Sequence, residues 1–205
     1  TSKKIYGREA DYASLSYFGR LGYNYDNRYF VQANIREDGS SRLHRNHRWG
    51  SFWSASAAWR IIEEDWMEGA SNVLTDAKIR ASYGANGTLP SDYFGYMGLS
   101  SVTENYNGLP GMFPSQIANE ELRWEKNYNF NIGIDFSLWR RIDASVEFYS
   151  RKTSDLLMDY PISMTTGFSS YLLNIGKVQN NGIELDLHAK VIDGKSFKWD
   201  MNFNM

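Results

Sequence analysis

The sequence predicts an all-β protein, an antiparallel up-and-down transmembrane β-barrel, and three observations support this prediction. Polar and apolar side chains alternate with a period of two in eight segments, whereas the helical period of about 3.6 residues is almost absent. These segments run over about 9 to 13 residues, against about 5 to 6 in soluble proteins. The links between them are sorted into short and long, as in outer-membrane barrels with short periplasmic turns and long extracellular loops.

Four strands are predicted in the first part of the chain, over residues 14–25, 29–36, 49–61 and 76–86. The Asp26-Asn27 pair between the first two is typical of a hairpin turn. Residues 62–68 are the one stretch that predicts a helical turn. One face of these strands carries, in order, the apolar residues Leu15, Tyr17, Leu21, Tyr23 and Tyr25; Tyr29, Val31, Ala33 and Ile35; Trp49, Trp53, Ala55, Ala57, Trp59 and Ile61; and Ala77, Ile79, Ala81, Tyr83 and Ala85.

Four more strands are predicted over residues 127–138, 142–149, 183–191 and 197–204. Arg140-Arg141 separates the first two, and an Asp193-Gly194 turn lies between the last two. Their apolar faces carry, in order, Tyr128, Phe130, Ile132, Ile134, Phe136 and Leu138; Ile142, Ala144, Val146 and Phe148; Ile183, Leu185, Leu187, Ala189 and Val191; and Phe197, Trp199, Met201 and Phe203.

The links between the predicted strands alternate between shorter and longer. In an up-and-down meander every second link lies at the same end of the sheet, so all the long links lie at one end. The short links are 26–27, 140–141 and 192–196, a moderate one is 62–75, and the long ones are 37–48, 87–122 and 152–176. From Trp49 to Trp59 the third strand rises about 33 Å, or about 25 Å of membrane height at a tilt near 40°. A soluble sheet over an ordinary core shows the same alternation, so strand length and loop sorting carry the membrane prediction.

In this barrel the apolar faces contact outer-membrane lipid, and the polar faces line a wet lumen. The charged residues predicted to face the lumen are Arg20, Arg36, Arg60, Lys78, Arg80, Asp135, Glu147 and Glu184. The chain stops inside an alternating strand, so we expect residues 1–205 to be part of a larger barrel domain. The alternative is that eight strands close alone into a small filled barrel.

The composition excludes several classes of protein. With 42% hydrophobic and 16% aromatic residues the chain is not disordered, and with no cysteine it has no disulfide or cysteine metal site. A net charge of −2 gives no broad basic surface for nucleic acid. No apolar run is long enough for a transmembrane helix, whereas the alternating strands of a barrel average out as hydrophilic.

No catalytic or cofactor motif is present in the sequence. His44 and His47 have a metal-like spacing but no carboxylate ligands nearby in the sequence, so we interpret them as part of a solvated loop. Glu63-Glu64-Asp65 suits the first turn of a helix better than acid–base chemistry. We therefore predict no enzyme activity, no catalytic residue, no metal and no cofactor.

The long link 87–122 differs from the others because aromatic residues are interleaved with glycine and asparagine. Exposed aromatic rings at the open end of a barrel can stack on sugars, although they can also pack the loop on itself. The candidate substrate contacts are Tyr93, Phe94, Tyr96 and Tyr106, with Met112 and Phe113 in the same loop.

Six phrases, in order along nearly the whole chain, resemble the SusC/RagA family of TonB-dependent outer-membrane transporters. Each phrase is weak alone, and the six together are specific because they fall on the predicted strands and loops. They are Ile35-Arg36-Glu37-Asp38-Gly39-Ser40-Ser41-Arg42, Arg48-Trp49-Gly50-Ser51-Phe52 through Ala58-Trp59-Arg60-Ile61, Lys78-Ile79-Arg80-Ala81-Ser82-Tyr83-Gly84, Leu122-Arg123-Trp124-Glu125, Tyr149-Ser150-Arg151-Lys152-Thr153-Ser154-Asp155-Leu156-Leu157, and Asn174-Ile175-Gly176 with Asn180-Asn181-Gly182-Ile183-Glu184-Leu185.

The resemblance implies about eight strands of a barrel of about 22 strands, with a plug domain and the remaining strands outside this chain. It implies a multi-pass protein of the outer membrane of a Gram-negative bacterium that imports glycans, oligosaccharides or peptides. A SusD-like surface lipoprotein is the implied partner, and TonB acts through a part of the protein not in this chain. The alternatives are a soluble β-rich carbohydrate-binding module, and a passive porin or surface adhesin barrel.

Overall fold

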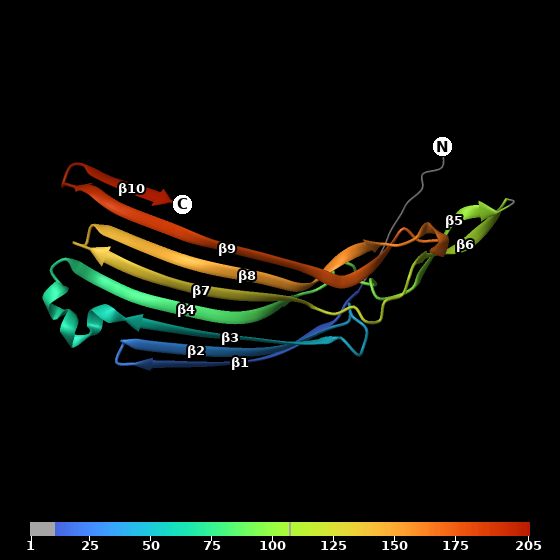
Figure 1. The fold of residues 1–205 in the computed structure, drawn as a ribbon, viewed down its shortest axis with the longest axis horizontal. Helices are drawn as coiled ribbons and strands as arrows, with labels where there is room; N and C mark the ends of the chain where they lie inside the picture. The colour runs from blue at the N-terminus through green and yellow to red at the C-terminus, as the bar shows by residue number, and fades with distance from the viewer. Residues whose placement is uncertain (1–10, 107) are drawn as a thin grey trace.

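A computed structural model describes residues 11–106 and 108–205, with the side chains of residues 103–106 and 110 outside the description. Figure 1 shows one long curved sheet with a separate hairpin at one end. Among the described residues, no helix has the length and apolar character needed to cross a membrane. The strands are β1 (Ser14–Tyr25), β2 (Tyr29–Ser40), β3 (Trp49–Arg60), β4 (Leu74–Thr88), β5 (Leu99–Tyr106), β6 (Leu109–Gln116), β7 (Glu125–Leu138), β8 (Ile142–Pro161), β9 (Ser170–Asp193) and β10 (Lys198–Asn204).

The sheet is an antiparallel meander, which confirms the predicted fold class. Its strand order is β1-β2-β3-β4-β7-β8-β9-β10, and β5 pairs only with β6 in a hairpin inserted between β4 and β7. The β1–β2, β7–β8 and β9–β10 turns lie at one end together with the link between β3 and β4, and the β2–β3, β4–β7 and β8–β9 links lie at the other, as Figure 1 shows. Two tight turns have consecutive residues at positive φ, Asp26 and Asn27 in one and Trp139 and Arg140 in the other, as expected for hairpin turns that follow the strand twist.

The register places the predicted apolar residues in continuous rows on one face. One row crosses the sheet through the pairs of Tyr23, Val31, Ala57, Ala81, Ile132, Phe148 and Ile183. Val31 and Ile183 in this row are 53% and 68% exposed, whereas the side chains of Asp135 and Glu147 on the other face are 28% and 20% exposed. On β2, β3 and β7 the exposed positions are thus mostly the apolar ones, which is the reverse of a soluble sheet, whereas both faces of the edge strands β1 and β10 are exposed.

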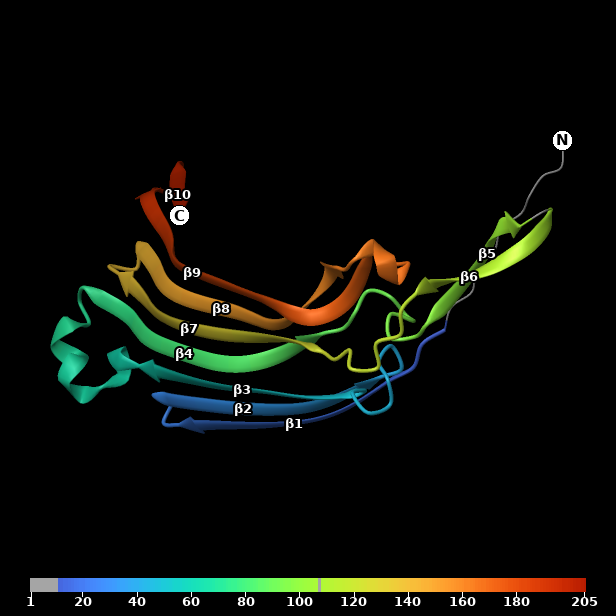
Figure 2. The same ribbon diagram turned by 45° about the vertical axis from the view of Figure 1, so that its right-hand side comes forward.

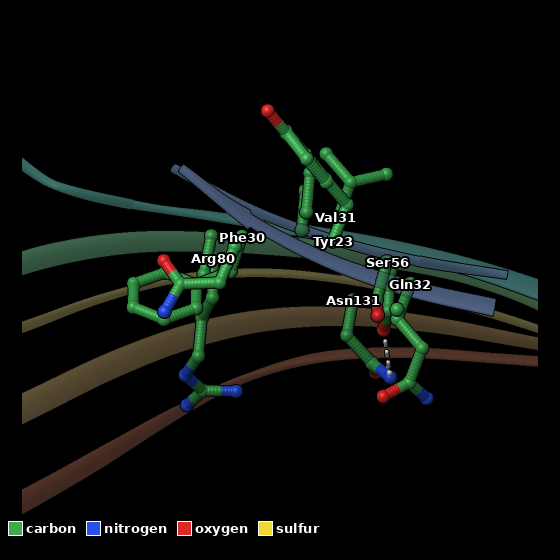
Figure 3. Close-up of a pocket in the computed structure, with 13 residues that line it drawn as sticks. Tyr23, Phe30, Val31, Gln32, Ser56, Arg80 and Asn131 are labelled. Carbon is green, nitrogen blue, oxygen red and sulfur yellow. Dashed lines mark hydrogen bonds between the residues drawn. The ribbon is translucent and has the colours of Figure 1, made fainter. Parts of the chain in front are cut away.

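The sheet is bent into a trough, as Figure 2 shows. Side chains crowd on the concave side of a bent sheet, so the more buried polar face is the inner one. Figure 3 shows the two faces directly, with Arg80, Gln32 and Asn131 on one side of the strands and Tyr23 and Val31 on the other.

Several predicted boundaries are wrong, and the strands are longer than the alternation indicates. The predicted loop 152–176 is mostly strand, because β8 and β9 pair out to Tyr160 and Tyr171 and leave only residues 162–169 as the link. The predicted loop 87–122 contains β5 and β6. The predicted helical turn is two short 3-10 helices, η1 (Ile61–Glu63) and η2 (Asp65–Ala70). Backbone pairing continues where the apolar alternation stops, because it does not depend on side-chain polarity.

The buried core lies beneath the long links and not between two sheets. Leu43, Phe52, Leu122 and Trp124 are buried together, and the Phe52 and Trp124 rings meet edge to face with centroids 5.4 Å apart. The Trp124 indole donates a hydrogen bond to the carbonyl oxygen of Arg48 at 3.1 Å. Partly buried residues that pack against this core are Leu89, Tyr96, Leu157 and Leu172. The core therefore fastens several loop segments to the end of the sheet.

At the short-turn end, the carboxylate of Glu64 joins three elements. It accepts hydrogen bonds from the Tyr29 hydroxyl at 2.6 Å and from the Trp59 indole at 2.9 Å. Arg28 in the β1–β2 turn lies 3.7 Å from its other oxygen. The hydrogen bonds from Tyr29 and Trp59, aided by the Arg28 charge, lower the pKa of Glu64 below its ordinary value. This contact fixes the link between β3 and β4 against the sheet.

Candidate functional site

The inner face carries an ion network across three strands. Arg80 of β4 lies 3.2 Å from Asp135 of β7 and 2.5 Å from Glu147 of β8, and Lys78 lies 3.1 Å from Asp135. Gly133 lies between Arg80 and Glu147 in the register, and a Cβ there would stand 3.2 Å from the guanidinium. The missing side chain at Gly133 thus lets Arg80 cross β7. The prediction that these charged residues share one polar face is consistent with this register.

Beside this network the inner face is an uncharged ladder of amide and hydroxyl side chains. Asn131 donates to Ser82 at 3.4 Å, as the dashed line in Figure 3 marks, and Asn34 donates to Ser54 at 2.9 Å. A hollow of about 460 Å³ opens over this part of the sheet, with Gln32, Arg80 and Asn131 in its lining. Such a surface offers both donors and acceptors to a polar solute or to another protein segment.

A larger cleft of about 700 Å³ lies among the long links. Its lining comes from the segments 88–95, 113–117 and 157–172, with Glu125 at the start of β7. The aromatic residues of the lining are Phe113, Phe168 and Tyr171, and its carboxylates are Asp92, Glu125 and Asp159. Among the described residues, no lysine or arginine lines the cleft, so its charged groups repel anions and its rings offer flat apolar surfaces.

Of the four predicted contact residues, Tyr93, Phe94 and Tyr96 flank lining residues of this cleft along the chain and are not themselves in its lining. The Tyr93 ring has the Arg42 guanidinium 4.3 Å from its centroid. Tyr96 packs on the buried core, with its ring 6.0 Å from that of His44. The carbonyl of Phe94 accepts a hydrogen bond from Gln116, and Tyr106 ends β5 with its side chain outside the description. Their contact with substrate stays a prediction.

His44 and His47 each face a carboxylate from a distant segment. His44 lies 3.6 Å from Glu120, and His47 lies 3.2 Å from Glu121. Over residues 11–106 and 108–205, no three His, Cys, Asp or Glu side chains gather in a group that could hold a metal ion. Both histidines are partly buried in these contacts, so the interpretation as a solvated loop understated their role in joining two links.

Sequence reasoning did not single out Phe168 and Tyr171 of the cleft. Both lie in the long link predicted over 152–176, where no alternation marks their positions. The nearby Asn119 side chain donates a hydrogen bond to the Leu172 carbonyl at 2.6 Å, which joins residues 53 positions apart. Only the fold brings these segments together. The signal available in the sequence was the aromatic content of the link itself.

A family model described as TonB dependent receptor-like, beta-barrel matches residues 3–205 of the chain. Among curated proteins, the chain is 40% identical over 196 residues to a TonB-dependent receptor of Formosa agariphila, a match that covers 94% of this chain and 19% of that protein. It is 38% identical over 200 residues to the TonB-dependent receptor SusC of Bacteroides thetaiotaomicron, which covers 93% of this chain and 20% of SusC. The chain thus spans about a fifth of the length of these relatives.

The chain also superposes on solved structures of the same architecture. The RagAB peptide importer in its closed-closed state superposes with a TM-score of 0.88 at 32% identity, over 95% of this chain and 22% of that chain. The siderophore receptor PirA from Pseudomonas aeruginosa superposes with a TM-score of 0.59 at 14% identity, over 94% of this chain and 34% of that chain, which supports the fold alone. The resemblance to SusC and RagA in the sequence is therefore confirmed.

Proposed function

Because the chain belongs to the TonB-dependent receptor β-barrel family, with SusC and RagA as relatives, we propose that it forms part of the wall of an outer-membrane nutrient importer. Residues 1–205 are a stretch of the barrel domain, and the plug domain and other strands belong to the rest of the protein. The barrel is a multi-pass protein of the outer membrane of a Gram-negative bacterium. Its activity is transport and not catalysis.

One observation carries this proposal: on β2, β3 and β7 the sheet exposes most of its apolar positions, whereas the polar positions of these strands are mostly half-buried. A row such as Val31, Ile132 and Ile183 left in water has no stabilising partner, whereas in a bilayer it faces acyl chains. The inner face, with its amide ladder and the Arg80 network, suits a wet lumen and a plug domain that packs against it.

Substrate is captured at the loop end, in the cleft that Phe113, Phe168 and Tyr171 line. The substrate class is glycans, oligosaccharides or peptides, which flat aromatic rings and hydrogen-bonding groups can both hold. Tyr93, Phe94, Tyr96 and Tyr106 are proposed as further contacts when the loops rearrange around substrate. A SusD-like lipoprotein closes this end from outside the cell, and TonB supplies energy through a part of the protein not in this chain.

The proposal is tested in the full-length transporter by changing the cleft without changing the barrel. The double variant Phe168→Ala/Tyr171→Ala should reduce substrate uptake several-fold, while heat-modifiable mobility on gels shows a normally assembled barrel. The matched control is Trp66→Ala, which removes an exposed aromatic ring, 66% exposed, at the opposite end. Uptake that is equal in both variants would contradict the assignment of the cleft.

Two controls separate the rival functions. Uptake through a passive porin persists when the proton-motive force is collapsed, whereas uptake through a TonB-dependent transporter stops. A soluble carbohydrate-binding module partitions into buffer, whereas a barrel stays with detergent or lipid.

A further inference from the structure

Three lysines lie on the lipid-facing side of the sheet, between its apolar rows and the long links. They are Lys126 of β7, Lys152 of β8 and Lys177 of β9, and all three are exposed. The register shows that they lie on the apolar face. Ile132 pairs with Phe148 on that face, and the pairs Tyr128–Lys152 and Lys126–Ser154 follow at even spacing along the same two strands. Charged side chains are therefore present on the outer face at the long-link end.

The polarity of the outer face changes in three successive rows toward the loops. The first row is Tyr83, Phe130, Ser150 and Asn181. The second row is Ala85, Tyr128, Lys152 and Gln179. The third row is Gly87, Lys126, Ser154 and Lys177. On β7, β8 and β9 aromatic residues thus mark the edge of the apolar band, and lysines follow at the depth of the lipid headgroups. The same rows lie deeper on β3 because the strands of a barrel tilt.

A hollow of about 430 Å³ lies on this part of the outer face. Lys152 and Lys177 line it, together with the aromatic residues Tyr83, Tyr128 and Phe130 and the polar residues Ser150, Ser154 and Gln179. Two cations, several hydroxyl and amide donors and an aromatic floor are the groups that hold a phosphate joined to a sugar.

The charge of this patch is not compensated by the protein. No carboxylate occupies the three rows, and none of the three lysines forms an ion pair with a described residue. The outer-face carboxylate Glu37 lies on β2, three strands from Lys126 or about 14 Å away, and accepts a hydrogen bond from Ser51. The anion that would balance this patch must come from outside the sheet.

We propose that Lys126, Lys152 and Lys177 bind the phosphate groups of a phosphorylated glycolipid in the outer leaflet. This assignment rests on the proposed function in one respect, namely that the long links lie on the extracellular side. The patch continues the lipid-facing surface, so its occupant is the headgroup of a lipid whose acyl chains lie on the apolar rows below. An annular lipid held in this way would steady β7, β8 and β9 beside the loop-end cleft.

The experiment uses the full-length transporter in a non-ionic detergent and purified lipid A as the probe. Titration followed by native mass spectrometry should show that phosphorylated lipid A binds at least about tenfold more tightly than enzymatically dephosphorylated lipid A. The triple variant Lys126→Gln/Lys152→Gln/Lys177→Gln should lose this preference. The matched control Lys190→Gln/Lys195→Gln/Lys198→Gln makes the same change of charge at the opposite end of β9, in the β9–β10 turn and on β10, and should keep it.

Three results would overturn the proposal: a wild-type protein with no preference for phosphate, a triple variant that keeps the preference, or a triple variant that changes the oligomeric state without lipid. Because the triple variant can fail to assemble, binding by the wild-type protein is also measured as salt is raised, which should weaken it. Substrate uptake by wild-type cells reports the proposed function separately, so the two ideas can fail independently.

Discussion

A charge placed at mid-height on the apolar face should destabilise the barrel far more than the same charge near its rim. Ala55 of β3 is exposed on this face, between Ala33 and Tyr83 in the register. It lies six residues from Trp49 and four from Trp59, or about 15 Å and about 10 Å in height at a tilt near 40°. Ala55→Arg therefore puts a guanidinium near the bilayer midplane.

The expected cost is about 2 to 4 kcal/mol for Ala55→Arg, because an arginine on the lipid face of a barrel is least stable at the midplane. Ser51→Arg places the same residue on the same face of β3, four positions nearer the loops and beside Glu37, and should cost only about 0 to 1 kcal/mol. Ala55→Met adds length without charge and should cost little.

The measurement is the free energy of unfolding of the full-length barrel in lipid vesicles, followed by tryptophan fluorescence in a urea titration. Ala55→Met separates the effect of charge from the effect of side-chain size. Ser51→Arg separates the effect of depth in the bilayer from the effect of the face. If Ala55→Arg is as mild as Ser51→Arg, the apolar rows do not face acyl chains, and the membrane orientation of the sheet is wrong.

Three further predictions concern the ends of the sheet. Leu122→Ala, in the buried core, should cost about 2 to 5 kcal/mol and increase proteolysis of the long links, whereas Leu21→Ala on the exposed face should do neither. An epitope tag at Gly108 in the β5–β6 turn should label on intact cells, and a tag at Asn27 only after the outer membrane is opened; labelling of both on intact cells would contradict the topology. The pKa of Glu64 is lowered in the fold, so its contact stabilises the barrel above the ordinary carboxyl pKa of about 4.3. This stabilisation is lost as pH falls through the lower folded value. In unfolding titrations, Glu64→Gln should therefore reduce the loss of stability at acid pH.

The sequence was sufficient for the fold class because lipid imposes a side-chain pattern that repeats every two residues. Each apolar row lies on one side of a pleated strand, so the face of Ile132 or Phe148 follows from position alone. The pattern fails at the loop ends of β8 and β9, which in the proposed importer lie beyond the bilayer. From Ser154 onward polar and apolar side chains no longer alternate on β8, while its backbone pairing with β9 continues to Pro161 and Ser170.

The hairpin of β5 and β6 was missed for a different reason. β6 contains Pro110 and Pro114, residues that argue against a strand in a continuous sheet. They are tolerated because β6 pairs on one side only, with β5, and its other edge needs no backbone donors. No rule based on local alternation distinguishes such a two-stranded unit from an irregular loop.

The cleft could not be predicted because its walls meet through contacts between distant segments. Asn174 accepts a hydrogen bond from the Arg123 backbone and donates to the carbonyl of Asp155, and Arg123 pairs with Asp155 at 2.8 Å. These bonds hold the segment after β6 against the ends of β8 and β9, next to the buried Leu122 and Trp124. Among the described residues, the buried core cluster therefore lies at the loop end of the sheet. In the proposed importer, a cleft built on this packing would hold its lining residues in a fixed geometry where substrate is captured.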